Sequence, residues 1–113
     1  MIKASPKEVI GSGFTGYLKA RYQDLVDNFG EPNNRTEDGK WQSGDGKVKV
    51  EWAFKIKGKK KPTIITIYDY KDNRPVEEIT DWHVGAKGDT APIEKFFKQF
   101  PGKPMEIVKK LTN

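Results

Sequence analysis

The sequence predicts an α+β domain, in which an antiparallel sheet of three to four strands carries its helices packed on one face. Three patterns lead to this prediction. Residues 48–56 alternate between large apolar and other side chains, which is the period of a half-buried strand. A second apolar segment at 63–70 follows a turn that contains Gly and Pro, as in a β-hairpin. Residues 22–29 and 93–100 carry apolar side chains at helical spacing.

The length and composition of the chain exclude several classes of protein. With 113 residues it fits one domain, residues 1–113, around one core, which is too small for doubly wound or barrel enzymes. The absence of cysteine excludes a disulfide framework, a thiolate nucleophile and Cys-ligated metal sites. No apolar run reaches the ~18 to 20 residues of a membrane span, and the first residues lack the apolar region of a signal peptide. We therefore expect a cytoplasmic protein without a membrane partner.

The N-terminal third contains three predicted elements and a loop. The Ser-Pro-Lys-Glu sequence at 5–8 is a capping box with Pro at the first helical position, which predicts one short helical turn. Residues 14–20 follow as a strand. A helix is predicted at 21–29, where Tyr22, Leu25, Val26 and Phe29 share one face and Gly30 begins the stop. Residues 31–46 are rich in turn formers and are predicted to form a loop.

The centre of the chain contains the predicted sheet. In the strand at 47–57 the large apolar side chains fall on one face. The segment 63–70 is apolar on both faces and is predicted to be a central strand. In a third strand at 78–84, Trp82 and Val84 face one way, opposite to Ile79, Asp81 and His83, and the glycine-containing sequence 85–88 ends the strand.

The C-terminal part is predicted to be helical. A helix begins near residue 89 and ends before Pro101, with four apolar side chains between 93 and 100 on one face. Residues 105–111 can form a last short helix. The apolar faces of these strands and helices define a common predicted core of Val50, Trp52, Phe54, Ile65, Ile67, Leu25, Phe29, Phe96 and Phe100.

Positive charge is concentrated in one segment of the chain. Lys and Arg number 21 against 16 Asp and Glu, which gives a net charge of +5, but the two signs are mostly interspersed. The predicted hairpin turn is the exception, because only there does one sign dominate. Like charges repel, so a cluster of this kind is easier to explain as a contact surface for phosphates or an acidic protein face. We call this predicted partner-binding segment the lysine tip: Lys55, Lys57, Lys59, Lys60 and Lys61.

Candidate catalytic groups are few. His83, the only histidine, lies two residues from Asp81 on one strand face, so the two form a candidate polar site in which Asp81 could orient a general base. No nucleophile or second metal ligand is placed by spacing to complete such a site, and a structural histidine is favoured. The carboxylates between 69 and 81 lack the Glu-x-Lys sequence of restriction-type nucleases. We expect no enzyme activity, no metal and no cofactor, and keep a small hydrolase as a third alternative.

Aromatic side chains elsewhere in the chain, taken together with the lysine tip, offer another interpretation. Trp41, Tyr68, Tyr70 and Trp82 could stack on bases while lysines contact phosphates. Their positions within alternating segments more simply predict that they belong to the core.

Several segments together carry a family resemblance, which extends over about residues 14–97. In order they are Tyr17-Leu18-Lys19-Ala20, Tyr22-x-x-Leu25-Val26-x-x-Phe29-Gly30-Glu31-Pro32, Val50-Glu51-Trp52, Thr66-Ile67-Tyr68-Asp69-Tyr70-Lys71 and Thr80-Asp81-Trp82-His83-Val84-Gly85. This order resembles a family of small bacteriophage-encoded proteins. The chain departs from the family pattern at Ala86, where a second glycine is expected, and in the run of lysines at 57–61.

The resemblance implies a phage accessory protein in the cytoplasm of the host bacterium, and it supplies no catalytic residues. By analogy with small phage proteins that block host machinery, we expect it to bind and inhibit or redirect a host macromolecule, as an anti-defence or host-takeover protein. The expected partner is a host protein or a protein–nucleic acid complex. The alternative is a basic accessory protein that contacts nucleic acid directly.

Overall fold

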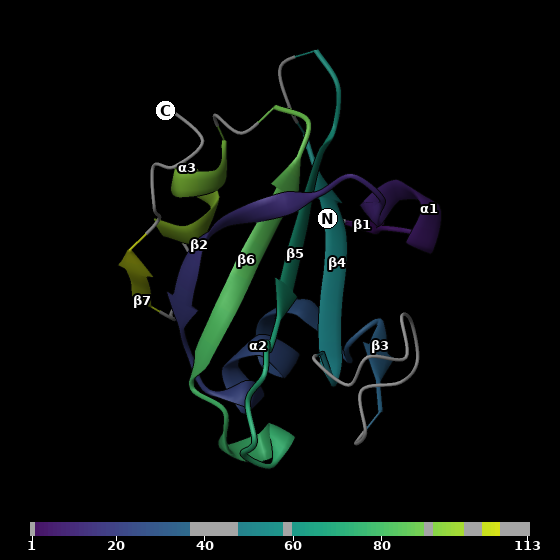
Figure 1. Cartoon of the computed structure of the whole chain (residues 1–113). Coiled ribbons are helices and arrows are strands. Elements are labelled where there is room, and N and C mark those ends of the chain that lie inside the picture. Colours follow the sequence, from purple (N-terminus) through teal and green to yellow (C-terminus); the bar gives the residue numbers. More distant parts are fainter. Residues whose placement is uncertain (1, 37–47, 58–59, 90–91, 99–102, 107–113) are drawn as a thin grey trace.

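Seven antiparallel strands form one sheet in the computed structural model of the chain (Figure 1). The structure describes residues 2–36, 48–57, 60–89, 92–98 and 103–106. The strand order is β1-β4-β5-β6-β2-β7, and β3 pairs with the same edge of β4 as β1 does, farther along that strand. The strands are β1 (Ile2–Lys3), β2 (Gly13–Lys19), β3 (Asn34–Arg35), β4 (Val50–Ile56), β5 (Thr63–Tyr68), β6 (Asp81–Lys87) and β7 (Lys103–Glu106).

The described helices are short and begin at the residues that the sequence marks. In α1 (Pro6–Val9) the Ser5 hydroxyl accepts a hydrogen bond from the Glu8 amide, and the Glu8 carboxylate accepts one from the Ser5 amide, which completes the capping box. The other helices are α2 (Tyr22–Phe29), the 3₁₀ turn η1 (Val76–Glu78) and α3 (Ile93–Lys98). None of the helices in this part of the chain has the length and apolar character needed to cross a membrane.

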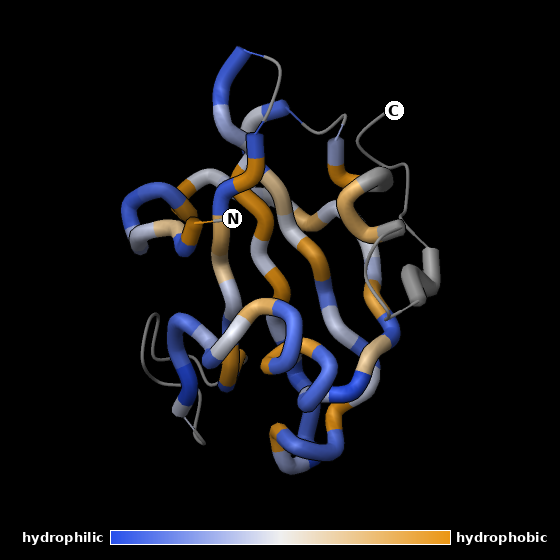
Figure 2. Tube along the Cα trace, turned by 180° about the vertical axis from the view of Figure 1, so that it is seen from behind, coloured by the Kyte–Doolittle hydropathy of each residue, from blue (hydrophilic) through white to orange (hydrophobic). Residues whose placement is uncertain are grey.

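The main core lies between one face of the sheet and the helices α2 and α3. In Figure 1, α2 lies behind the strands, and Figure 2 views the molecule from that side. Trp52 and Trp82 meet edge to face in this core, with ring centroids 5.5 Å apart, and both are almost fully buried. Eight of the nine predicted core residues lie here, either buried or packed against it; the ninth, Phe100, is outside the described residues.

The opposite face of the sheet carries a second, smaller apolar cluster beneath α1. Val9 packs there against Ala4, Ala53 and Ile64. Apart from the area beneath α1, this face lies under none of the described helices, and we call the whole face the uncovered face. One residue from each of four neighbouring strands forms a row across this face. In that row Glu51 of β4 pairs with Tyr68 of β5, Tyr68 with His83 of β6, and His83 with Tyr17 of β2.

The antiparallel α+β architecture is as predicted, but the sheet has more strands than the expected three to four. The additional strands β1, β3 and β7 are two to four residues long. The prediction that all helices pack on one face is wrong for α1, which lies on the uncovered face with its Val9 against the smaller cluster. It holds for α2 and α3, whose apolar residues join the main core.

Three further predictions, about the bounds of one strand, the burial of Ile79 and the C-terminal segment, are wrong. Strand β6 covers Asp81–Lys87 and not the predicted 78–84, because Glu78 lies in the turn η1 and the strand continues through Gly85. Glycine at 85 allows close contact, since a Cβ atom there would lie 2.5 Å from the Thr66 hydroxyl. Ile79 is buried in the main core rather than facing away from it. Met105, predicted to begin a helix, lies in β7, which pairs with β2; residues 107–111 of that predicted helix lie outside the described residues.

Candidate binding site

Five rings gather on the uncovered face at the end of the sheet where β5 ends. We call them the ring cluster: Phe14, Tyr17, Tyr68, Tyr70 and His83. The His83 ring lies at the centre, with centroids 5.5 Å from Phe14, 5.1 Å from Tyr17, 5.5 Å from Tyr68 and 5.4 Å from Tyr70. The five rings line an open hollow of about 250 Å³. The cluster draws on β2, β5 and β6, together with the residues that follow β5.

Two of these rings are open to solvent. Tyr17 is 37% exposed and Tyr70 is 41% exposed, and together they form one aromatic patch with the rings around His83. Tyr17 packs edge to face on Phe14, with centroids 5.0 Å apart. Each exposed ring is therefore supported from beneath and offers its outer side to a ligand.

The two rings at the centre of the ring cluster, His83 and Tyr68, are partly buried. Burial lowers the pKa of His83 below its ordinary value, and the negative charge of Asp69 opposes this shift. Among the described residues, the buried Nδ1 atom of His83 has no hydrogen-bond partner. The pKa of the Tyr68 hydroxyl is raised, chiefly by burial and further by the charge of Glu51. The lowered pKa of His83 favours its uncharged ring, and the packed rings around it make this surface a platform for stacking.

Basic side chains border the ring cluster. The ammonium of Lys71 lies 5.4 Å from the centre of the Tyr70 ring, a cation–π distance. The backbone of Lys71 has a φ of 54°, a left-handed conformation that costs energy in a residue other than glycine. Lys19 is exposed on the same face, and its side chain forms no hydrogen bond or ion pair within the described residues. Both lysines are thus available to an anionic group near the rings.

The predicted polar site of Asp81 and His83 is not joined by a hydrogen bond in the described residues. Asp81 instead accepts hydrogen bonds from Arg74 and from the Thr80 hydroxyl, both at 3.2 Å. Arg74 also binds Asp72, at 2.7 Å. The two residues share the uncovered face as the alternation predicts, but Asp81 lies in a polar network with Arg74 while His83 lies among rings.

The lysines of the lysine tip differ in their surroundings, because one is paired and the other described ones are exposed. The ammonium of Lys55 forms an ion pair of 2.7 Å with Glu8, which ties β4 to α1 and leaves it half-buried. Lys57, Lys60 and Lys61 are exposed, as expected of a turn in water, and Lys59 lies outside the described residues. Three positive charges of the tip therefore have no ion-pair partner among the described residues.

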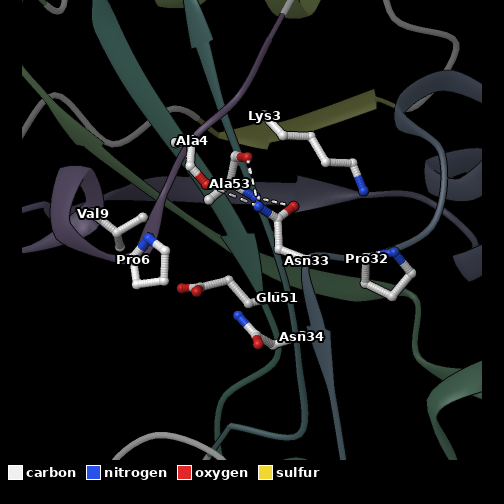
Figure 3. A pocket seen from close by; sticks show the side chains of 9 residues that line it. All are labelled: Lys3, Ala4, Pro6, Val9, Pro32, Asn33, Asn34, Glu51 and Ala53. Atoms are coloured by element: carbon white, nitrogen blue, oxygen red, sulfur yellow. Dashed lines mark hydrogen bonds between the residues drawn. The ribbon is translucent and has the colours of Figure 1, made fainter.

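A buried carboxylate lies beside the ring cluster on the uncovered face. Glu51 is only 8% exposed and lines a cavity of about 260 Å³ between β1, α1, β3 and β4 (Figure 3). Burial raises the pKa of the Glu51 carboxyl from its ordinary value of 4.5 to about 7. The alternation in the sequence places Glu51 opposite to the core but predicts a solvated side chain, so this burial was not expected.

The sequence interpretation also assigned Tyr68 and Tyr70 to the core, and the structure corrects this. Tyr68 and Tyr70 lie in the ring cluster, away from the core. Trp82, which was assigned to the core with them, is buried there as predicted. Trp41 lies outside the described residues. Among the residues the structure describes, no three His, Asp or Glu side chains come close enough to hold a metal ion.

Comparisons of the chain with models of protein families, with curated proteins and with solved structures find no match. The function must therefore be inferred from the ring cluster, the charges around it and the Glu51 cavity.

Proposed function

We propose that this protein acts by binding a macromolecule, without catalysing a reaction, and that the ring cluster is its contact surface. The observation that carries this proposal is the exposure of Tyr17 and Tyr70 on a base of packed rings. Supported aromatic rings lose little conformational entropy on binding, and such rings dominate the energy of many interfaces.

The chemistry around the rings favours a partner with exposed bases and phosphates. Single-stranded nucleic acid is bound where bases stack on aromatic rings while cations contact the backbone. Tyr17 and Tyr70 offer the rings, and Lys19 and Lys71 offer the cations next to them. The exposed lysines of the tip add positive charge at the other end of β5, roughly 25 Å away at ~3.3 Å per residue. The net charge of +5 favours the same class of partner.

The resemblance to bacteriophage proteins supports a setting for this binding. In the cytoplasm of a host bacterium, the protein would bind a host protein–nucleic acid complex and inhibit or redirect it, as an anti-defence or host-takeover protein. A host protein without nucleic acid is the second candidate, because exposed tyrosines are also typical anchors of protein interfaces.

Binding of a labelled single-stranded oligonucleotide, measured by fluorescence anisotropy at low salt, tests the proposal. We expect the wild type to bind single strands more tightly than a duplex of the same sequence. The double variant Tyr17→Ala/Tyr70→Ala should lose about tenfold or more in affinity, since each stacked base contributes ~1–3 kcal/mol. The double variant Tyr17→Phe/Tyr70→Phe keeps both rings and should bind nearly as well as the wild type.

Two controls separate loss of contact from loss of structure. Ile10 is 71% exposed at the end of α1, outside the ring cluster, so Ile10→Ala should change neither the affinity nor the melting temperature. Equal affinity of the wild type and the double alanine variant would refute the ring cluster as the contact surface. If the wild type binds no oligonucleotide but a pull-down from host lysate returns a protein after nuclease treatment, the second candidate is correct.

A further inference from the structure

The Glu51 cavity is a preformed hollow with an unpaired carboxylate in its wall. No hydrogen bond or ion pair reaches the Glu51 carboxylate from the described residues. In Figure 3 the carboxylate points toward Pro6 and Val9, and the amide of Asn34 lies beside it. The ionised form of a carboxyl that is more than nine-tenths buried and has no partner is costly, so the group is neutralised either by a proton or by a cation that pairs with it.

The other polar groups of the cavity wall are already occupied. The side-chain amide of Asn33 donates to the carbonyls of Ala4 and Ala53, at 3.2 and 3.0 Å, and its oxygen accepts from the Ala53 amide at 3.1 Å. The ammonium of Lys3 donates to the carbonyl of Glu31 and points away from the carboxylate (Figure 3). Free acceptor capacity is therefore left on Glu51, and the remaining N–H donors of this wall belong to Asn34 and to the Lys3 ammonium, which points away from the carboxylate.

The walls of the cavity are held in place by several contacts. The Lys55–Glu8 ion pair fixes α1 over β4, and the ammonium of Lys87 donates to the carbonyls of Glu8 and Ile10 at the end of that helix. The Ala4 amide also donates to the Ala53 carbonyl at 2.9 Å, which joins the N-terminal segment to β4. A site that is built before its ligand arrives loses little entropy on binding.

We propose that the Glu51 cavity binds an organic cation, a guanidinium or ammonium group on a short aliphatic stem, with Glu51 as its counter-ion. The stem would lie against Pro6, Val9 and Pro32, as aliphatic stems of basic side chains do on apolar surfaces. At about 260 Å³ the cavity is just below the ~300 Å³ at which pockets for drug-sized ligands begin, so it suits a group the size of one side chain.

Other ligand classes fit less well. A metal ion such as Mg²⁺ or Ca²⁺ requires six or more oxygen ligands, and the cavity offers one free carboxylate and one amide. An anion would be repelled by Glu51. A neutral ligand would leave the buried charge uncompensated, whereas a cation forms charge-assisted hydrogen bonds with it. This site is separate from the ring cluster, and its ligand does not depend on the function proposed above.

Binding of small probes, measured by calorimetry and by NMR chemical shifts at pH 8, tests this proposal. Agmatine and butylamine carry the two cationic groups on aliphatic stems, and butanol and butyrate are neutral and anionic controls. We expect at least one cation to bind with a Kd of about 1 mM or tighter, with shifts centred on residues of the cavity wall, and neither control to do so. A blocked tripeptide with Arg or Lys at its centre distinguishes the source of the cation. Tighter binding of the tripeptide indicates a partner's side chain, and tighter binding of the free amine indicates a small molecule.

Three variants complete the test. Glu51→Gln keeps the shape of the side chain and removes its charge, so cation binding should weaken about tenfold or more. Asn34→Asp adds a second carboxylate and should strengthen it. Glu77→Gln removes an exposed carboxylate elsewhere, which pairs with Arg35, and should leave it unchanged. The proposal is overturned if no cation binds, if butanol binds as tightly as butylamine, or if a folded Glu51→Gln variant binds as tightly as the wild type.

Discussion

Replacing Glu51 with glutamine should stabilise the free protein, and the gain should grow as the pH rises. Glutamine has the shape of a protonated glutamate, so near pH 4 the variant and the wild type should have nearly equal free energies of unfolding. At higher pH the wild-type carboxyl ionises readily in the unfolded chain, where its pKa is 4.5, but resists ionisation in the fold, where the pKa is about 7. Between these values the folded state holds more protons than the unfolded state, so the stability of the wild type falls as the pH rises.

The size of the effect follows from the two pKa values. The pKa of Glu51 rises from 4.5 in the unfolded chain to about 7 in the fold. At about 1.36 kcal/mol per pKa unit, the wild type loses about 3 kcal/mol of unfolding free energy, and this loss is complete at pH values above the folded pKa. This is a large share of the ~5–15 kcal/mol that stabilises a typical domain. No neighbouring charge offsets this loss of stability. The Lys3 ammonium is bound to the Glu31 carbonyl, and Lys55 is paired with Glu8. Tyr68, which lies opposite Glu51 on β5, carries no positive charge. Glu51→Gln at pH 8 should therefore raise the melting temperature by roughly 10 °C or more.

Urea unfolding of both proteins from pH 4 to pH 8.5 measures this difference directly. Burial also lowers the pKa of His83, but this residue is present in both proteins and cancels from the comparison. Glu77→Gln is a control in which the opposite sign is expected. The ion pair with Arg35 lowers the pKa of Glu77, so removing this carboxylate should decrease the free energy of unfolding at pH values above that pKa. A difference between Glu51→Gln and wild type that stays constant over the whole pH range would refute the reasoning, since it would mean that the carboxylate is compensated in the fold.

Two further predictions concern the core and the lysine tip. Trp52→Ala should lower the free energy of unfolding by roughly 3–5 kcal/mol, because it removes a buried ring and its hydrogen bond of 2.9 Å to the Gly30 carbonyl; an unchanged urea midpoint would contradict the assigned core face. Replacing the three lysines at 59–61 with alanine should leave melting unchanged and make the slope of log affinity for single strands against log salt shallower by roughly 2–3, and an unaltered slope would remove the tip from the interface.

The elements that could be predicted are those specified by a local pattern. Alternation at 48–56 and helical spacing at 22–29 depend on side chains a few residues apart, and both predict the correct element and the correct buried face. Strands β1, β3 and β7 could not be predicted in this way. Each has two to four residues, and it is a strand only because a partner from elsewhere in the chain supplies its hydrogen bonds, as β4 does for β1.

The candidate site was predicted in part, because which residues share a face is local but what covers that face is not. The alternation correctly places Trp52 and Trp82 on the core face of the sheet, and Glu51 and His83 on the opposite face. The burial of Glu51, however, arises from the N-terminal segment, which lies nearly fifty residues away in sequence. The rings around His83 likewise come from other strands, so a sequence pattern that identifies an aromatic residue cannot assign it to the core or to the uncovered face.

Tyr68 connects the two sites on the uncovered face. It lies opposite Glu51 on one side and stacks on His83 on the other, with ring centroids 5.5 Å apart. The charge of Glu51 contributes to the raised pKa of the Tyr68 hydroxyl, so a cation held by Glu51 would reduce an electrostatic effect that reaches the ring cluster. Any change that the cation makes in the affinity of the rings for their partner must be matched by an equal change, caused by the partner, in the affinity of the cavity for the cation. Measuring oligonucleotide affinity with and without the bound amine, in wild type and in Glu51→Gln, would therefore reveal whether the row of side chains from Glu51 to Tyr17 transmits binding energy or only shares one surface.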